Sequence, residues 1–247
     1  MDVDGKVALI TGGSNGIGEG VARYLASRGA HLVLADIDDA RGRELAAELK
    51  GRFIHTDVAD PAASTAAVKH AVDEFGGLHI AHLNAGVTSW CSMGDDFDPE
   101  AYRRSMAINL DGVVYGIAAA RQAINESGGG TIVATASMAG LVAAPFDPIY
   151  CANKHAVVGL VRSLGSAYEP EGIRIHALCP SFARTNIIKG AEQNLIDMGF
   201  PILDVADVVA AFARILDSES TGAAWYVVAG RESEPFEFRR APGPRLD

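Results

Sequence analysis

Short apolar runs alternate with longer amphipathic segments along almost the whole chain. Seven of these runs have the length and composition of buried strands, at residues 6–10, 31–35, 52–56, 78–83, 131–136, 172–178 and 223–228. Segments with helical periodicity lie between them, at residues 19–28, 39–50, 61–75, 99–127, 150–168 and 204–216. This alternation predicts an α/β fold in which one doubly wound sheet of seven parallel strands carries helices on both faces.

Two segments fall outside this alternation. Residues 182–201 are predicted to be a mobile loop beside the substrate. Residues 231–247 combine several arginines (Arg231, Arg239, Arg240 and Arg245) with Phe236 and Phe238, and we interpret them as a docked C-terminal tail or a subunit contact. We expect one domain over residues 1–247. Ligands of such sheets bind at the carboxyl ends of the strands, so the residues that follow the strands are the candidates for a site.

A glycine-rich turn follows the first predicted strand and leads directly into the first predicted helix. Its glycines, Gly12, Gly16 and Gly18, are spaced G-x-x-x-G-x-G. Gly12 permits a sharp turn, Gly16 lets the backbone approach a pyrophosphate, and Gly18 lets the helix pack closely on the strand. The N-terminus of the helix would face the anion. Strand, turn and helix together favour a dinucleotide cradle of the Rossmann type over a plain strand-to-helix turn.

Acidic residues end the second and third predicted strands. At Asp36, a carboxylate can accept both hydroxyls of an adenosine ribose and would repel a ribose phosphate. Ile37 follows, so no cation adjoins Asp36, although Arg41 lies one helical turn further on. This pattern favours NAD over NADP. The alternative role for Asp36 is to cap the next helix, which the two aspartates after Ile37 could do instead. Asp57 could reach an adenine amino group or cap its own loop.

Tyr150 and Lys154 are four residues apart in the first turn of a predicted helix, so their side chains share a face. A free tyrosine has a pKa near ~10, and a cation about 4 Å away at an effective dielectric of ~20 would lower it by roughly three units, into the range of a general acid or base. Ser137, after the fifth strand, could hold a substrate oxygen beside the phenol. The spacing is common by chance, and the alternative is a half-buried tyrosine and a surface lysine. The catalytic interpretation of the pair is favoured because a dinucleotide-binding motif precedes it in the chain.

Three further positions carry candidate chemistry. Asn84, Ala85 and Gly86 end the fourth strand and permit close approach of a cofactor ring or ribose. Asn109 lies inside a predicted long helix, where asparagine is unfavourable, and so indicates a kink, a held water or a specific hydrogen bond. Asp147 either meets a polar substrate group or forms a turn before the Tyr150 helix.

Composition narrows the class of protein. The sequence has 247 residues, of which 49% are hydrophobic and 21% charged, as in a compact α/β protein with a sizeable core. A net charge of -10 argues against nucleic acid or an anionic membrane as a partner. The three cysteines lack paired spacing, and the N-terminus lacks the features of a signal peptide, so we expect a cytoplasmic protein. No apolar run approaches the ~18 residues of a membrane span.

No metal site is expected. His79 and His82 lie three apart on a predicted strand and therefore face opposite sides of the sheet. Neither has a carboxylate or a cysteine at ligand spacing nearby. We interpret His82 as a hydrogen-bonded histidine in a mostly buried strand.

Together these motifs resemble those of the one-domain short-chain dehydrogenases/reductases, over residues 6–230. The matching positions are Thr11, Gly12, Gly16, Gly18, Asp36, Asp57, Val58, Asn84, Ala85, Gly86, Asn109, Ser137, Tyr150, Lys154 and residues 180–185. The resemblance implies that Tyr150 is the catalytic acid and base, that Ser137 orients the substrate oxygen, and that Lys154 binds the nicotinamide ribose and lowers the tyrosine pKa. It also implies that Asn109 holds a water of a proton relay.

The cofactor site implied by the resemblance draws on the ends of the first four strands and the sixth, and on the helix with Tyr150. Its expected residues are Gly12, Ser14, Asn15, Gly16, Ile17, Gly18, Asp36, Ile37, Asp57, Val58, Asn84, Ala85, Gly86, Tyr150, Lys154, Pro180, Ala183 and Thr185. The chain departs from the usual pattern of the family at Leu83, Ala136 and Ser181, where Asn, Ser and Gly are usual. A looser similarity to the hydroxyprostaglandin dehydrogenases, around Tyr150 and Lys154, does not identify the substrate.

We therefore expect an NAD-dependent oxidoreductase that interconverts a secondary alcohol and a ketone on a hydrophobic or ring scaffold, with Ser137, Asp147 and Tyr150 at the substrate. Apolar side chains that either line its pocket or pack in the core are Val87, Trp90, Met93, Met138, Val142, Phe146, Phe182, Ile187 and Ile188. The alternatives are a sugar-nucleotide epimerase or dehydratase, which the chain length disfavours, and a non-catalytic NAD-sensing protein, which the intact Ser/Tyr/Lys set disfavours. The resemblance also implies a homotetramer or homodimer that associates through the long helices.

Overall fold

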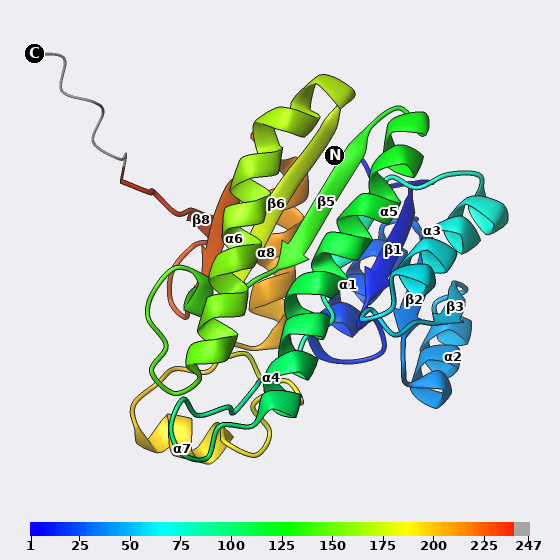
Figure 1. Cartoon of the computed structure of the whole chain (residues 1–247). Coiled ribbons are helices and arrows are strands. Elements are labelled where there is room, and N and C mark those ends of the chain that lie inside the picture. Colours follow the sequence, from blue (N-terminus) through cyan, green and yellow to red (C-terminus); the bar gives the residue numbers. More distant parts are fainter. Residues whose placement is uncertain (240–247) are drawn as a thin grey trace, which may run out of the picture.

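One continuous sheet forms the middle layer of the molecule (Figure 1). The structure is a computed structural model, and it describes residues 1–239. The strands are β1 (Val7–Thr11), β2 (His31–Asp36), β3 (Arg52–His55), β4 (Ile80–Leu83), β5 (Gly130–Thr135), β6 (Ile173–Pro180), β7 (Ala223–Val227) and β8 (Glu234–Pro235). Their order is β3-β2-β1-β4-β5-β6-β7-β8. Every pair from β3 to β7 is parallel, as predicted, and only the pairing of β7 with β8 is antiparallel.

Helices cover both faces of the sheet. They are α1 (Gly16–Ser27), α2 (Asp39–Glu48), α3 (Pro61–Phe75), α4 (Pro99–Met106), α5 (Gly112–Glu126), α6 (Pro148–Tyr168), α7 (Glu192–Asp197) and α8 (Val205–Asp217). One core cluster joins the sheet to α3, α5 and α6, and a second joins its other face to α1, α2 and α8. Successive β1 residues alternate between the clusters, Val7 and Leu9 in the first and Ala8 and Ile10 in the second, as the two-residue period of a strand requires.

The strand order reverses between β1 and β4, because the chain crosses from β3 at one edge back to the centre. At such a switch point the connections leave β1 and β4 on opposite faces of the sheet, and a crevice opens between them. Short caps fix where the helices begin. Asp60 caps α3 by accepting a hydrogen bond from the amide of Ala62, and Pro61 occupies the first helical position.

The structure corrects four sequence expectations about the elements. An eighth strand, β8, lies at the edge of the sheet within the predicted tail. The predicted helix over 99–127 is interrupted by a π-helical turn, η1 (Ala107–Asp111), between α4 and α5. Helix α6 begins at Pro148, two residues before Tyr150, and Asp147 is its N-cap. The segment 182–201, predicted to be a loop, contains α7.

The tail docks on the sheet as far as the structure describes it. The Phe238 ring packs against the first core cluster, and the Arg162 guanidinium lies 3.6 Å from its centroid. Residues 240–247, with Arg240 and Arg245 of the predicted tail, lie outside the described residues. None of the helices in the described part of the chain has the length and apolarity needed to cross a bilayer.

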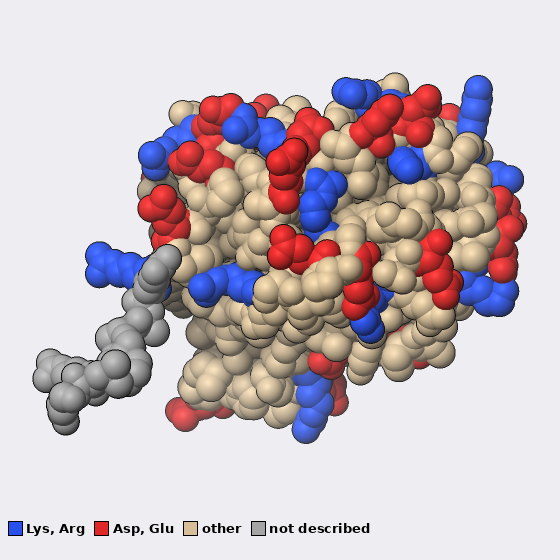
Figure 2. Space-filling view, turned by 90° about the horizontal axis from the view of Figure 1, so that it is seen from above, with Lys and Arg blue, Asp and Glu red and all other residues tan. Residues whose placement is uncertain are grey.

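Figure 2 shows the end of the molecule at the top of Figure 1, away from α7. Acidic and basic side chains are interspersed there among uncharged ones. The net charge of -10 is therefore not gathered into one patch on this face.

Candidate active site

A cavity of about 720 Å³ opens at the carboxyl ends of the central strands. One half lies against the glycine-rich turn and the ends of β2 and β3, and the other lies between the start of α6 and the segment 182–201. The cavity brings together most of the predicted cofactor residues, namely Gly12, Asn15, Gly16, Ile17, Asp36, Ile37, Asp57, Val58, Asn84, Ala85, Gly86, Pro180, Ala183 and Thr185. Of the predicted site residues, Ser14, Gly18 and Asn109 do not line it.

The turn after β1 requires glycine for two separate reasons. Gly12 has a left-handed φ of 59°, and a Cβ there would lie 2.9 Å from the Ala85 Cα. A Cβ at Gly18 would lie 2.1 Å from the Gly12 carbonyl oxygen, so only glycine lets α1 begin so close to the turn. Asn15, the cap residue of α1, makes no side-chain cap bond, so its side chain leaves the first amides of the helix unpaired. This cradle fits a pyrophosphate.

Asp36 faces the cavity from the end of β2, with hydrogen bonds that fix its carboxylate. Its oxygens accept from the amides of Ser14 at 2.9 Å and Asp38 at 3.1 Å. Asp38, not Asp36, caps α2, since its side chain accepts from the Arg41 amide at 3.0 Å. The capping alternative for Asp36 is therefore wrong. Ser14 contributes through its backbone, because its side chain is buried outside the cavity.

Arg41 is committed to acidic partners on the neighbouring helices. Its guanidinium lies 2.7 Å from Glu19 on α1 and 3.0 Å from Glu44 on α2. Asp57 serves its own loop, because its carboxylate accepts from the Ala59 amide at 3.0 Å, and it also lines the cavity.

A chain of hydrogen-bonded polar groups crosses the ends of β1, β4 and β5. The Asn84 amide donates to the carbonyls of Thr11 at 3.2 Å and Gly12 at 3.1 Å. Its oxygen accepts from the Thr135 hydroxyl at 3.2 Å, and that hydroxyl lies 2.9 Å from Nε2 of His82. His82 is thus hydrogen-bonded in a buried strand, as interpreted from the sequence, although its Nδ1 has no partner among the described residues.

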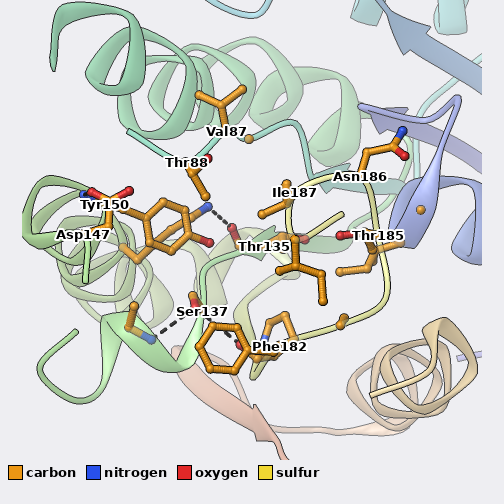
Figure 3. Close-up of a pocket in the computed structure, with 18 of the residues that line it drawn as sticks. Val87, Thr88, Thr135, Ser137, Asp147, Tyr150, Phe182, Thr185, Asn186 and Ile187 are labelled. Carbon is orange, nitrogen blue, oxygen red and sulfur yellow. Dashed lines mark hydrogen bonds between the residues drawn. The ribbon is translucent and has the colours of Figure 1, made fainter. Parts of the chain in front are cut away.

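Ser137, Tyr150 and Lys154 meet where the two halves of the cavity join. In Figure 3 the Tyr150 phenol points toward the middle of the cavity, and the segment with Thr185 and Ile187 lies opposite. The Ser137 hydroxyl accepts from the Ala139 amide at 3.1 Å and donates to the Pro180 carbonyl at 3.4 Å. Lys154 donates to the Thr135 carbonyl at 2.8 Å, and its Nζ lies 5.5 Å from the centroid of the Tyr150 ring.

Burial controls the protonation of this group. It raises the pKa of Tyr150 to about 12, against a smaller lowering by the Ser137 hydroxyl. The negative charge of Asp147 raises it further. Burial also lowers the pKa of Lys154 to about 8, so the ammonium is still the major form at neutral pH. Contrary to the expectation from the sequence, Lys154 does not bring the tyrosine pKa below ~10, because desolvation outweighs the attraction of the cation.

Asn109 acts on the backbone of the cavity wall. Its oxygen accepts from the Val87 amide at 2.8 Å, and its amide donates to the Val87 carbonyl at 2.7 Å. It lies in the π turn η1, which explains an asparagine in the middle of a helix. Of the three roles left open by the sequence, the structure therefore shows a specific hydrogen bond.

Asp147 is buried and already has four donors. Its carboxylate accepts from the amides of Ser89, Trp90 and Tyr150 and from the Ser89 hydroxyl. The turn before α6 is therefore what the structure shows for this residue. The predicted contact with a polar substrate group stays a prediction.

The substrate half of the cavity is apolar and aromatic. The Phe200 ring packs edge-on against Phe182, with centroids 5.2 Å apart, and against Phe146, with centroids 6.1 Å apart. Of the predicted pocket residues, Val87, Trp90, Met138, Val142, Phe146, Phe182, Ile187 and Ile188 line the cavity. Met93 does not, and its side chain is exposed to solvent.

Sequence reasoning missed several lining residues, namely Thr88, Asn186, Ala191, Asn194, Leu195, Met198 and Phe200. Most of them lie on or beside α7. That helix has six residues, too few for a periodic signal, and it lines the cavity only because tertiary folding places it there.

Comparison with known proteins identifies the class. A family model for short chain dehydrogenases matches residues 6–195. A 3-alpha-(or 20-beta)-hydroxysteroid dehydrogenase of Mycobacterium tuberculosis is 35% identical over 233 residues, which cover 92% of this chain and 89% of the relative. The cyclohexanol dehydrogenase of Acinetobacter is 35% identical over 236 residues, which cover 91% of this chain and 94% of the relative.

Solved structures agree. A 3-ketoacyl-(acyl-carrier-protein) reductase from Brucella melitensis, in complex with NADH, aligns with a TM-score of 0.85 at 30% identity, covering 93% of this chain and 99% of that one. Levodione reductase aligns with a TM-score of 0.86 at 26% identity, covering 92% and 97%. The chain belongs to the short-chain dehydrogenase/reductase family. It is an oxidoreductase of CH–OH and keto groups, and its family uses a nicotinamide cofactor.

Proposed function

We propose that this enzyme oxidises a secondary alcohol with NAD, or reduces the matching ketone, on a neutral apolar ring scaffold, and that Tyr150 is its acid and base. The observation that carries the proposal is the meeting of Ser137, Tyr150 and Lys154 at the junction of a dinucleotide cradle with an aromatic cavity. When bound, the nicotinamide would accept or supply the hydride.

The residues of the chain handle the proton and the substrate oxygen. In oxidation, the Tyr150 phenolate takes the hydroxyl proton while Ser137 hydrogen-bonds the same oxygen. Lys154, held by the Thr135 carbonyl, supplies a positive charge near the phenol and would bind the nicotinamide ribose. Asn109 holds the backbone of Val87 through two hydrogen bonds, and the relay water that the family resemblance assigns to Asn109 stays a prediction.

Alkaline pH should favour oxidation. A tyrosine with a pKa of about 12 is protonated at neutral pH, so it is ready to donate in reduction and must lose a proton before oxidation. We expect the rate of oxidation to rise with pH across the alkaline range and the rate of reduction to fall.

NAD is preferred over NADP because the end of β2 offers a fixed carboxylate and no available cation. Asp36 is held by two amides, and Arg41 is neutralised by Glu19 and Glu44. A ribose diol can donate to Asp36, whereas a ribose phosphate would be repelled. The glycine positions that a Cβ would obstruct support the same cofactor site.

A neutral substrate is supported by the charges that line the cavity. Lys154 is the only lysine or arginine among the lining residues of the described chain, and Asp36, Asp57 and Asp147 are the only acids. A phosphate or carboxylate on the substrate would therefore find no cation besides Lys154, and its burial would be costly. The hydroxysteroid and cyclohexanol dehydrogenases named above act on ring alcohols by their names, which supports a ring scaffold.

The first experiment is a screen by NADH absorbance. Purified protein with NAD, and separately with NADP, is given steroid alcohols, cyclic terpenols, hydroxy fatty acids and small diols. We expect turnover of a ring alcohol with NAD, and a loss of about 10²- to 10⁴-fold in Tyr150→Phe, because general acid–base catalysis contributes that much. Turnover that survives Tyr150→Phe would reject the proposed mechanism.

The cofactor assignment has its own test. Asp36→Ser should lower kcat/KM for NAD by about ten- to a hundredfold, the value of a hydrogen bond to a charged group, and should raise the ratio of NADP to NAD turnover. Asp60→Ser is the matched control, since Asp60 caps α3 outside the cavity and serine also caps helices. An unchanged NADP to NAD ratio in Asp36→Ser would remove the basis for the assignment.

We also propose a homotetramer or homodimer that associates through the long helices. Val72 on α3 and Val114 on α5 are exposed on neighbouring helices, which supports that face as the contact. The three cysteines are unpaired in the structure, in keeping with a reducing compartment such as the cytoplasm.

A further inference from the structure

Trp90 has an unusual backbone. Its φ is 46°, and Trp90 and Lys50 are the only non-glycine residues with positive φ in the described chain. A bulky side chain in the left-handed region is disfavoured, because its Cβ approaches the following carbonyl oxygen. The conformation persists only where surrounding contacts impose it, and such positions are concentrated at functional sites. Trp90 lines the cavity, and its side chain is 61% exposed.

The Asp147 carboxylate imposes that conformation. One oxygen accepts from two successive amides, those of Ser89 at 2.8 Å and Trp90 at 2.9 Å. The other accepts from the Ser89 hydroxyl, and that hydroxyl in turn accepts from the Cys91 amide at 3.2 Å. Asp147 is only 6% exposed, so each bond forms away from competing water and is strong. Together these bonds fix the backbone on both sides of the Trp90 Cα.

The same carboxylate begins the helix of the acid and base. Asp147 caps α6 by accepting from the Tyr150 amide at 3.0 Å. The Trp90 loop is also held at Val87 by the two bonds from Asn109. Asp147 therefore fixes the position of the indole relative to the helix that carries Tyr150. This matters because small displacements of a substrate from its reactive geometry reduce turnover steeply.

We propose that Trp90 is a specificity-determining residue for extended ring alcohols. Asp147 is a positioning residue, which holds the Trp90 side chain in the wall of the cavity at a fixed position relative to Tyr150. The proposal rests on the proposed function for its substrate class. Asp147 then acts through Trp90 and not by touching the substrate. On this proposal a fused-ring alcohol held at Tyr150 packs its far rings on the exposed indole, and a single-ring alcohol lacks that contact.

The kinetic test compares a steroid alcohol with cyclohexanol. Trp90→Ala should lower kcat/KM for the steroid alcohol by about tenfold, mainly through KM, because lost apolar contact changes discrimination by this amount. The value for cyclohexanol should fall less, so the ratio of steroid to cyclohexanol kcat/KM should drop. Asp147→Asn should shift the ratio in the same direction. An unchanged ratio in Trp90→Ala, or a gain for the steroid, would overturn the proposal.

Asp147→Asn is informative because asparagine also caps helices, so α6 keeps its first turn while the negative charge is lost. Besides Asp147, the groups that shift the pKa of Tyr150 are Ser137 and the Cys179 thiol, and the Lys154 ammonium lies nearby. Since Asp147 raises that pKa, its removal should move the rise of oxidation rate to lower pH. Asp98→Asn is the matched control: Asp98 caps α4 in the same way, outside the cavity, and its variant should keep both the ratio and the profile.

A second readout needs no turnover. The sequence has two tryptophans, and Trp225 is buried on β7, so Trp225→Phe leaves Trp90 as the only indole. In that background Asp147→Asn should lower the fluorescence anisotropy of Trp90, while Asp98→Asn should not. Unchanged anisotropy would overturn the positioning role even if no alcohol in the screen reacts. Lowered anisotropy with no turnover would instead count against the proposed function alone.

Discussion

Single buried polar residues connect the core of this protein to its cavity. Because Thr135 donates to the Asn84 oxygen, its hydroxyl oxygen is left to accept from His82, which assigns the His82 proton to Nε2. Asn84 is then oriented with its amide toward the Gly12 carbonyl. The Thr135 carbonyl holds Lys154. One threonine thus links the cofactor turn with the lysine beside the phenol.

Buried histidines should make the protein acid-sensitive. Burial lowers the pKa of His82 to about 3 and that of His176 to about 4, from an ordinary 6.5. Below about pH 6.5 the unfolded chain binds protons that the folded chain does not, so the free energy of unfolding falls as pH drops, by up to ~1.4 kcal/mol per pH unit for each histidine. The loss continues to about pH 4 for His176 and about pH 3 for His82.

Urea unfolding between pH 7.5 and 5 measures this slope. His82→Gln keeps a donor for Thr135 but does not titrate, so its stability should fall less steeply with acid than that of the wild type. His155→Gln, at an exposed position on α6, should leave the slope unchanged. Equal slopes in the wild type and His82→Gln would contradict the assignment.

The placement of most candidate site residues around one cavity could be predicted at this scale, because these residues follow strands at fixed spacings. Tyr150 and Lys154 share a helical face, and Asp36 ends a strand, whatever surrounds them. The tyrosine pKa could not be predicted, since it depends on burial. Nor could the partners of Asp147, because Ser89 and Trp90 lie far from it in the sequence and only tertiary packing brings them together.

At the scale of elements, the segment 182–201 forms one wall of the cavity and is held in place by backbone bonds and ion pairs. Backbone bonds join the Arg184 amide to the Leu203 carbonyl and the Leu203 amide to the Phe182 carbonyl. The Arg184 side chain lies 2.9 Å from Glu192 at the start of α7 and 2.7 Å from Asp204 at the cap of α8. These two ion pairs join the outer side of the segment to α7 and α8, while the rings of Phe182 and Phe200 pack on its inner side.

Arg184→Gln should therefore open this segment. We expect KM for the alcohol to rise a few-fold with little change in melting temperature, because exposed ion pairs are weak individually. Added salt should raise KM of the wild type in the same direction. Arg43→Gln removes a comparable exposed pair with Asp39 on α2 and should leave KM unchanged. A salt-independent KM in the wild type would argue against the closing role of Arg184.

At the scale of the whole molecule, the parallel arrangement of the strands could be predicted, but the antiparallel strand at the edge of the sheet could not. Alternating strands and helices with right-handed crossovers leave few topologies, and the observed order from β3 to β7 is one of them. Strand β8 has two residues and pairs through the bond from the Phe236 amide to the Ala224 carbonyl. Two residues are too few to show a strand pattern in the sequence, and β8 forms only because β7 lies beside it.

The exposed valines on α3 and α5 give a test of assembly. Val114→Arg would place a charge on the proposed contact, where burial of an unpaired charge is costly, so the variant should elute later than the wild type from gel filtration. Ala210→Arg, at an exposed position on α8, should elute with the wild type. A wild type that elutes as a monomer would refute the proposed association.

The π turn between α4 and α5 has a consequence for how this chain can be altered. A π turn holds one residue more than the α-helical path it replaces, so deleting one residue from η1 would let a regular helix run through while α4 and α5 kept their faces on the sheet. Such a deletion is expected to melt no earlier than the wild type and yet to lose turnover, because Asn109 would no longer meet Val87. Calorimetry and the alcohol assay on one shortened chain would then show whether the extra residue of the π turn is required for stability or only for turnover.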